Sequence, residues 1–388
     1  MKVKSMLSVF AVVAAVVLSA TAFADSIVVD GVTWNYTVND GTTTVTLNGV
    51  DGNTQAKTTN PSFNAAHIPW TFTNNGTTYT VSSFADTLFM NWTNLVGELT
   101  IPGTVKGAPG RFTECPNLTK VTFCDGVEII QWYQFKNCKK LVGGVVIPSS
   151  ITEVRTQSFS WDNRITGAWV KGGATSSANT SVDGRATFIG ATAMKVLLLG
   201  PNTTAVNGKP SSDKILDRVT GCVVYAPDNG NWTSSKFLPG GTDTVLRYYG
   251  PGQDVDIATD DVAGTITITP TTVETLQEAL NLAATFKSAF GLDTRIAVTN
   301  RIATAVTIPA SATSSTMFDL HSWVTFNVTT QAQLDNTLAA VSSDSMLIVD
   351  PTGATENLTV PDGRQVFVVL NEGDKIRCRL NGFTISFK

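Results

Sequence analysis

A phenylalanine recurs along one stretch of the chain at almost constant spacing. Phe89, Phe112, Phe135 and Phe159 lie 23, 23 and 24 residues apart, and six residues after each comes Leu95, Leu118, Leu141 or Ile165. Three units continue into a short β-like phrase: "ELTIP", "VTF" or "VVIP". A weaker copy follows at Phe188 with Met194. Recurrence of apolar residues at fixed offsets over 20–29 residues predicts a solenoid of stacked coils.

The position three residues after each phenylalanine shows what kind of slot the repeat provides. It holds Trp92, Cys115, Cys138 and Asp162. A slot that accepts cysteine or tryptophan favours packing in the core, where a free thiol behaves as a small hydrophobe. A Cys115–Cys138 disulfide between stacked coils is the alternative. A metal site is not expected, because zinc needs about four ligands and the chain has two histidines, His67 and His321.

The predicted core of the repeat follows from these offsets, because each coil is too small to bury its apolar residues alone. It comprises Phe89, Leu95, Phe112, Cys115, Leu118, Phe135, Cys138, Leu141, Phe159 and Ile165.

The phrases "FTECPNLTKVTF" and "FKNCKKLVGGVVIPSSITEV" resemble the BspA-like class of bacterial surface leucine-rich repeats. The resemblance extends over about residues 27–200. The chain departs from the pattern at Arg111 and Gln134, which replace the usual alanine before phenylalanine, and at Asp162, which replaces cysteine. The resemblance implies a surface protein without catalytic activity that binds host or other extracellular proteins, as in adhesion.

The N-terminus predicts export. The chain begins MKVK, continues with an apolar run from Met6 to Ala20, and has small residues at Ala22 and Ala24. These features predict a signal peptide over residues 1–24 that is cleaved after Ala24. No later run approaches the roughly 20 apolar residues of a membrane span, so we expect a secreted or cell-surface protein.

Residues 25–83 and 201–251 flank the predicted repeats of residues 84–200. The first segment alternates polar and apolar residues around "NDGT" and "NNGT", which predicts two β-hairpins that cover the open core of the first coil. The second segment has a strand, Trp232 and another strand before a Gly-Pro-Gly break, and we interpret it as the C-terminal cap.

Residues 252–388 change character. Two helical patterns, around Leu276 and Leu334, are each followed by strand-like runs, which predicts a duplicated helix-plus-strands module. This module is weakly similar to the segments that open pectate-lyase-like β-helix domains. The acidic run "DVDIATDD" that precedes the first helix is interpreted as a solvated linker, with a calcium site as the alternative. The predicted fold is therefore β-rich: a short leucine-rich-repeat solenoid with β caps and a smaller α/β module.

Charge and motifs exclude several functions. Removal of the signal peptide leaves 25 basic and 31 acidic residues, a net charge of −6, which argues against a nucleic-acid partner. The sequence has no recognisable hydrolase, metalloprotease or phosphate-binding motif. We therefore expect no enzyme activity, no cofactor and no metal, and a β-helix enzyme that degrades polysaccharides is the alternative.

Aromatic and arginine side chains in the repeats are the remaining candidates for ligand binding. Such residues dominate binding energy in protein interfaces, and aromatic rings also stack on sugars. The alternatives are that they bind extracellular proteins, that they bind carbohydrate, or that they fill the rim of a short solenoid. The candidates are Trp132, Tyr133, Arg155, Trp161, Arg164 and Trp169.

Overall fold

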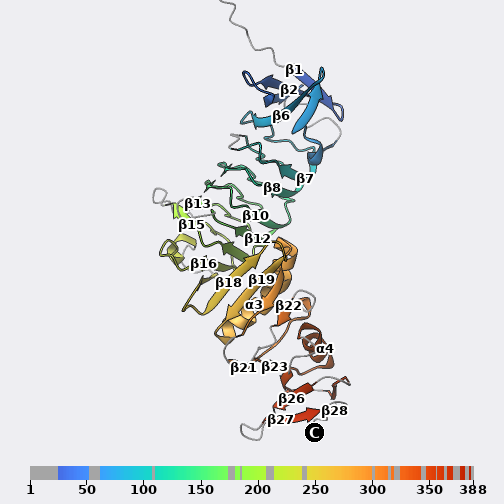
Figure 1. The fold of residues 1–388 in the computed structure, drawn as a ribbon, viewed down its shortest axis with the longest axis vertical. Coiled ribbons are helices and arrows are strands. Elements are labelled where there is room, and N and C mark those ends of the chain that lie inside the picture. Colours follow the sequence, from blue (N-terminus) through green and yellow to red (C-terminus); the bar gives the residue numbers. More distant parts are fainter. Residues whose placement is uncertain are drawn as a thin grey trace, which may run out of the picture.

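The computed structural model of the chain is an elongated rod, with the N-terminal strands at one end and the C-terminal strands at the other (Figure 1). It describes residues 25–51, 62–106, 110–173, 180–183, 186–206, 214–237, 243–298, 302–312, 316–318, 324–341, 347–354, 356–361, 365–369, 376–380 and 384–385. The predicted signal peptide lies outside the described residues. No helix among them is both long and apolar enough to cross a bilayer.

The N-terminal segment forms a five-stranded sheet at the top of the rod (Figure 1). Both predicted hairpins are present: β2 pairs antiparallel with β3, and β5 with β6. The buried Trp34 packs against Phe63, Phe89 and Trp92 at ring-centroid distances of 5.5, 6.0 and 5.7 Å, so the sheet covers the first coil. Its strand order is β1 (Asp25–Val29), β2 (Val32–Val38), β3 (Thr44–Val50), β6 (Thr77–Phe84) and β5 (Thr71–Asn74).

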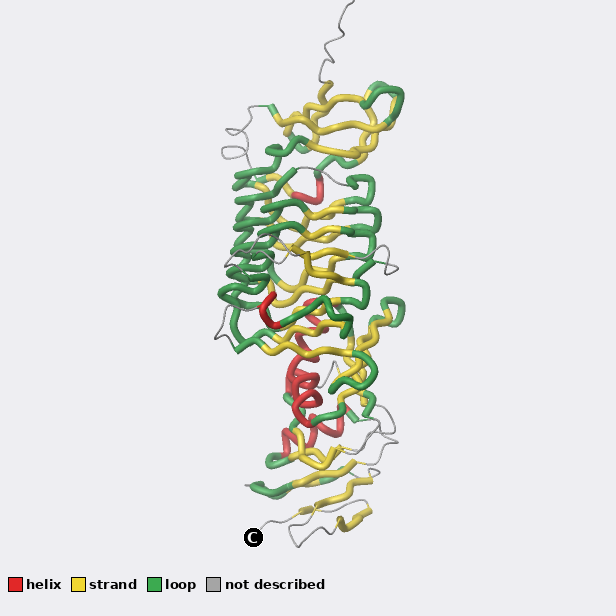
Figure 2. The backbone as a smooth tube through the Cα atoms, turned by 90° about the vertical axis from the view of Figure 1, so that its left-hand side faces the viewer, coloured by secondary structure: helices red, strands yellow, loops and turns green. Residues whose placement is uncertain are grey.

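The repeats stack their strands in parallel ladders on two walls of the solenoid, joined by turns (Figure 2). On the sheet wall, the first three strands are β4 (Phe63–Asn64), β7 (Leu95–Ile101) and β8 (Leu118–Phe123). The sheet wall continues through β10 (Gly143–Ile147), β12 (Ile165–Val170), β14 (Val196–Leu199), β16 (Val223–Pro227) and β17 (Val245–Tyr249). The opposite wall has β9 (Ile129–Ile130), β11 (Glu153–Val154), β13 (Thr180–Asp183) and β15 (Thr203–Val206).

The repeated phenylalanines form one column of stacked rings through the core. Successive centroids from Phe89 through Phe112, Phe135 and Phe159 to Phe188 lie 4.4, 5.6, 5.4 and 5.4 Å apart, with interplanar angles of 15° or less. The weaker copy at Phe188 therefore belongs to the same stack. All ten predicted core residues are buried, at 0–1% exposure.

The cysteines of the repeat are buried free thiols, and the Cys115–Cys138 disulfide considered as the alternative is wrong. The Cys115 thiol donates to the carbonyl oxygen of Phe89 at 2.9 Å, and the Cys138 thiol donates to that of Phe112 at 3.1 Å. Burial, with a smaller contribution from Asp162, raises the pKa of Cys138 well above its usual value. Each protonated thiol therefore links its coil to the preceding one.

Asp162 occupies the cysteine slot of the next coil. Its Oδ1 accepts the backbone N–H of Cys138 at 2.7 Å, while its Oδ2 is buried without a partner. Burial raises the pKa of this carboxyl well above its usual value. A protonated Oδ2 would be a hydrogen-bond donor at the position where the Cys115 and Cys138 thiols donate in the two preceding coils.

We expect Asp162→Asn to stabilise the fold at about pH 7 by roughly 1–3 kcal/mol, since it removes a buried acid that lacks one partner. The pKa of Asp162 is higher in the folded protein than in the unfolded chain, where it is about 3.9. Asp162 therefore makes its full contribution to the free energy of unfolding below that value, and this contribution is lost as pH rises through the folded-state pKa. Urea unfolding at several pH values should therefore show a gain that shrinks toward about pH 4. A gain that grows on acidification, or one matched by Asp125→Asn at an exposed position, would contradict this assignment.

The sheet does not end at the predicted boundary between residues 251 and 252. Tyr249 of β17 pairs in parallel with Val255 of β18, and the sheet wall from β10 to β22 has nine strands. The linker interpretation of the acidic run is wrong, because most of that run is strand β18. The added strands are β18 (Val255–Asp260), β19 (Thr265–Pro270), β20 (Asp293–Ile296) and β22 (Thr316–Phe318).

Helix α3 (Val273–Phe290) crosses the outer face of this sheet (Figure 1). A capping box of Thr272 and Thr275 begins the helix, and Gly291 ends it with a left-handed φ of 75°. The apolar stripe that includes Leu276, Leu280 and Phe286 is buried. It belongs to the same core cluster as the outward-facing sheet residues Trp169, Val196, Leu198 and Tyr225.

Two glycines make room for the end of α3. A Cβ on Gly144 would lie 2.1 Å from the carbonyl oxygen of Ala289, and a Cβ on Gly167 would lie 3.1 Å from the Phe290 ring. The helix therefore contacts β10 and β12 as well as β19 and β20. It lies over the sheet wall between β10 and β20 and leaves the face of β7 and β8 open.

The lower end of the rod has a second sheet and a second helix, α4 (Gln331–Ala340). Like α3, α4 connects two neighbouring parallel strands, here β23 and β24. The sheet order is β21 (Ile302–Val306), β23 (Val324–Asn327), β24 (Leu347–Asp350), β26 (Gln365–Val369) and β27 (Ile376–Leu380). The remaining elements are β25 (Leu358–Thr359), β28 (Thr384–Ile385), α2 (Ser234–Phe237), η1 (Ala65–His67) and η3 (Ala310–Ala312). Duplication of this unit and its similarity to β-helix segments stay predictions.

Candidate functional site

The turns between the two strand walls form a third, hydrogen-bonded side of the solenoid, which we call the turn wall. The backbone N–H of Phe112 donates to Gln134, and that of Phe135 donates to Ser158 in the next coil. Two residues beyond each phenylalanine, the chain takes a left-handed conformation, as at Asn137 (φ 61°) and Trp161 (φ 66°). This regular backbone fixes the side chains that point away from the core.

Three predicted candidates, Trp132, Tyr133 and Arg155, meet on the turn wall. Together with Asp86, Arg111 and Gln131 they line a cavity of about 390 Å³, which we call the Trp132 pocket. Trp132 is 52% exposed, and Tyr133 is half-buried in a left-handed conformation with φ 59°. The pocket spans four successive coils, because its residues precede Phe89, Phe112, Phe135 and Phe159.

Ion pairs hold the polar side chains of the Trp132 pocket. Arg111 binds Asp86 through two parallel bonds, Nε to Oδ1 at 3.1 Å and Nη2 to Oδ2 at 2.5 Å. Arg155 donates to Gln131 Oε1 at 2.6 Å and pairs with Glu153 at 2.9 Å. Its guanidinium carbon also lies 4.8 Å from the centre of the Trp132 ring, within the range of a cation–π contact.

The other three candidates lie elsewhere. Trp161 is 37% exposed on the turn wall, where Arg218 lies 5.0 Å from its ring centre. Arg164 is exposed and does not line the Trp132 pocket. Trp169 is 4% exposed and packs against Phe290 of α3 at 6.0 Å, so its assignment as a ligand-binding residue is wrong.

A second concavity lies on the sheet wall, where the cover of α3 ends. We call it the sheet-face groove; it has a volume of about 1060 Å³ and lies between the end of α3 and strands β8 and β10. Its lining includes Val142, which is 48% exposed, and Phe290. Three lysines on its border are each ion-paired: Lys120 with Glu98 at 3.8 Å, Lys171 with Asp261 at 2.5 Å and Lys287 with Asp293 at 3.0 Å.

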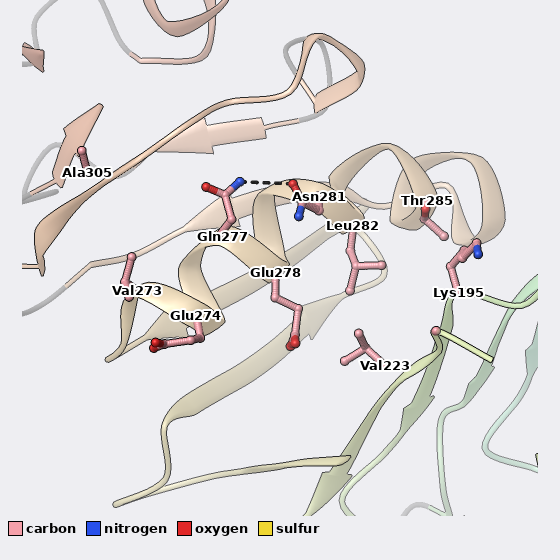
Figure 3. A pocket seen from close by; sticks show the side chains of 11 residues that line it. Lys195, Val223, Val273, Glu274, Gln277, Glu278, Asn281, Leu282, Thr285 and Ala305 are labelled. Atoms are coloured by element: carbon pink, nitrogen blue, oxygen red, sulfur yellow. Dashed lines mark hydrogen bonds between the residues drawn. The ribbon is translucent and has the colours of Figure 1, made fainter. Parts of the chain in front are cut away.

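A third concavity, of about 800 Å³, runs beside α3, and its lining includes Glu274, Gln277, Glu278 and Lys195 (Figure 3). Glu278 accepts the hydroxyl of Tyr225 at 2.7 Å and Arg247 Nε at 3.3 Å. Gln277 exchanges two hydrogen bonds with the backbone of Thr307, at 2.8 and 3.0 Å. These contacts join α3 to β16 and β17 on one side and to the residue after β21 on the other, so Gln277 and Glu278 have a structural role.

No three His, Cys, Asp or Glu side chains within the described ranges are grouped to hold a metal ion. Sequence reasoning missed Asp86, Arg111 and Gln131 as members of a pocket. The departure from alanine at Arg111 was the available signal, since a charged residue beside the core phenylalanine has to reach solvent or a partner. Asp86 and Gln131 had no signal, because the distance between coils does not appear in the sequence.

Comparison with known proteins agrees with the repeat. Residues 71–166 match the family model for the BspA type leucine rich repeat region, in six copies, which confirms the resemblance predicted from the sequence. No curated protein sequence matches the chain.

Solved structures of leucine-rich repeat proteins are similar to the chain at low identity. One from Bacteroides ovatus is 14% identical, with 88% of this chain and 78% of that chain covered and a TM-score of 0.37. A leucine rich cell surface protein from Faecalibacterium prausnitzii is also 14% identical, with coverages of 84% and 76% and a TM-score of 0.35. The leucine-rich repeat protein of T. pallidum is 18% identical, with coverages of 42% and 67% and a TM-score of 0.33.

Proposed function

We propose that the chain, whose residues 71–166 form a BspA-type leucine-rich repeat region, is a non-catalytic surface or secreted protein that binds extracellular proteins. The predicted signal peptide supports export, and the repeat supports a surface protein. A solenoid held together by backbone ladders is a rigid scaffold, which reduces the ordering cost of binding a partner.

The sheet-face groove is the surface that best supports protein binding. Helix α3 covers the sheet from β10 onward, so a partner has access to the N-terminal strands and to the groove at the border of the helix. Val142 and Phe290 supply apolar area there, and Lys120 and Lys287 supply a polar rim. An apolar centre with a charged rim is the usual arrangement of a transient protein interface. The exposed Val142 is the observation on which the proposal depends.

We expect Val142→Asp to weaken binding to an extracellular protein by about tenfold or more, because it places a charge in the apolar part of the groove. The measurement is surface-captured binding of residues 25–388 to a panel of immobilised collagen, fibronectin, laminin and fibrinogen. Val28→Asp is the matched control, since Val28 is 63% exposed in the cap, away from the groove. Absence of binding to any of the panel, or equal loss in both variants, would count against this surface.

The same preparation tests the absence of catalysis. We expect incubation with soluble plant and host polysaccharides to release no reducing sugar above the level of a heat-inactivated sample. Titratable residues in the three concavities are largely engaged in ion pairs that support the fold, as Glu278 and Arg111 illustrate. Release of sugar that depends on Glu274 and Glu278 would instead favour the β-helix enzyme considered from the sequence.

A further inference from the structure

The Trp132 pocket has an open aromatic surface. One face of the Trp132 ring meets the Arg155 guanidinium, and the side chain nevertheless stays 52% exposed. Tyr133 adds a second ring to the lining. A flat ring that is half exposed and is contacted by a guanidinium suits a ligand that has an apolar C–H surface and a polar edge. Pyranose rings have such a surface.

The polar residues of the pocket retain donors that the fold does not use. Gln131 is 8% exposed, its Oε1 accepts from Arg155, and its amide nitrogen has no partner among the described residues. Arg111 uses Nε and Nη2 on Asp86, and its Nη1 has no bond within the described part of the chain. Both groups are held in place by their existing bonds, so a ligand that accepts from them orders little. Hydroxyl oxygens arranged around a ring are suitable acceptors.

Charge distinguishes among sugars. Each guanidinium in the pocket is paired with a carboxylate, Arg111 with Asp86 and Arg155 with Glu153, so neither arginine of the lining is an unpaired cation. Lys136, whose Nζ lies 5.2 Å from the centre of the Tyr133 ring, is outside the lining. A sulfated or uronic-acid chain would be recognised through unpaired cations. The volume of about 390 Å³ is at the lower end of ligand pockets, which measure roughly 300–1,000 Å³. We infer that the Trp132 pocket is a binding subsite for a short segment of a neutral oligosaccharide, independent of the protein binding assigned to the sheet-face groove.

The test is isothermal titration calorimetry of residues 25–388. The neutral probes are hexasaccharides of β-1,4-glucan, α-1,4-glucan, β-1,4-mannan and β-1,4-xylan. Polygalacturonate and chondroitin sulfate are the charged probes. We expect at least one neutral hexasaccharide to bind, and Trp132→Ala to lose roughly tenfold or more of that affinity, since it removes the stacking ring. Trp132→Phe should lose less, because it keeps a smaller ring.

Trp161→Ala is the matched control, because Trp161 is also an exposed tryptophan beside an arginine on the turn wall, outside the pocket. Unchanged affinity in this variant, with loss in Trp132→Ala, supports the assignment. No binding of any neutral probe, binding of the charged probes alone, or equal loss in the two variants overturns it. These outcomes do not decide whether the sheet-face groove binds a protein, because that proposal is tested by Val142→Asp on the sheet wall.

Discussion

Replacement of Phe135 by alanine is expected to lower the free energy of unfolding by about 3–5 kcal/mol, the range for a fully buried phenylalanine. Phe135 is 0% exposed and lies in the middle of the ring column, 5.6 Å from Phe112 and 5.4 Å from Phe159. Its edge also meets Phe123 at 5.8 Å. The cavity therefore opens on both neighbouring coils, and neither can move in without breaking its own backbone bonds.

Urea unfolding monitored by circular dichroism measures the change. Trp161→Ala is the control for loss of an aromatic side chain that is only partly buried, at 37% exposure, and it should cost less than Phe135→Ala. Phe135→Leu should fall between the two, because it keeps much of the buried volume. A loss below about 1 kcal/mol for Phe135→Ala would show that the ring column does not hold the coils together.

The second large effect concerns the fragment of residues 25–251, which lacks α3. Removal of α3 would expose Trp169, Val196, Leu198 and Tyr225 on one sheet face. Removal of β18 would leave β17 as an unpaired edge of the sheet. Each large apolar side chain that loses its cover costs roughly 1.5–3 kcal/mol of burial. We therefore expect the fragment to aggregate or to bind a hydrophobic dye strongly, while residues 25–388 remain monodisperse in gel filtration.

A matched variant of the fragment separates exposed apolar area from general misfolding. Trp169→Thr, Leu198→Thr and Tyr225→Thr would give the uncovered strands the polar outer face that Thr100 and Thr122 give β7 and β8. This variant should recover solubility. A fragment that is monodisperse without these changes and binds no dye would mean that α3 is dispensable to the solenoid.

The repeat was predictable because its signal is local and repeated. A phenylalanine every 23 or 24 residues specifies the coil length, and the cysteine slot three residues later indicates a buried position. The hairpins of the cap followed from Asp-Gly and Asn-Gly turns. Each of these features depends on neighbours in sequence or on the next equivalent coil, which is itself a nearly constant distance away.

The docking of α3 was not predicted, although a portion of its signal was visible. The outward positions of β7 and β8 hold Glu98, Thr100 and Thr122, whereas those of β14 and β16 hold Val196, Leu198 and Tyr225. A strand that is apolar on both faces is covered on both faces. The covering helix begins about 50 to 80 residues after these strands, and pairing such distant segments requires the three-dimensional path.

The candidate sites were likewise predictable by residue type but not by their contacts between distant segments. Trp132 and Arg155 were identified by residue type, yet their meeting across two coils and the contribution of Asp86 depend on how the coils stack. Trp169 has the same residue type and the opposite environment, because α3 lies over it.

The stacked ladders also determine how the rod would respond if a partner held one end while the other was fixed. Tension along the rod would act along the hydrogen bonds between coils, so that successive coils separate in turn instead of shearing together. Helix α3 is the exception, since it contacts both β10 and β20 and so spans several rungs. We expect the coils between the cap and β10 to lengthen first under load, while the helix-braced segment keeps its shape.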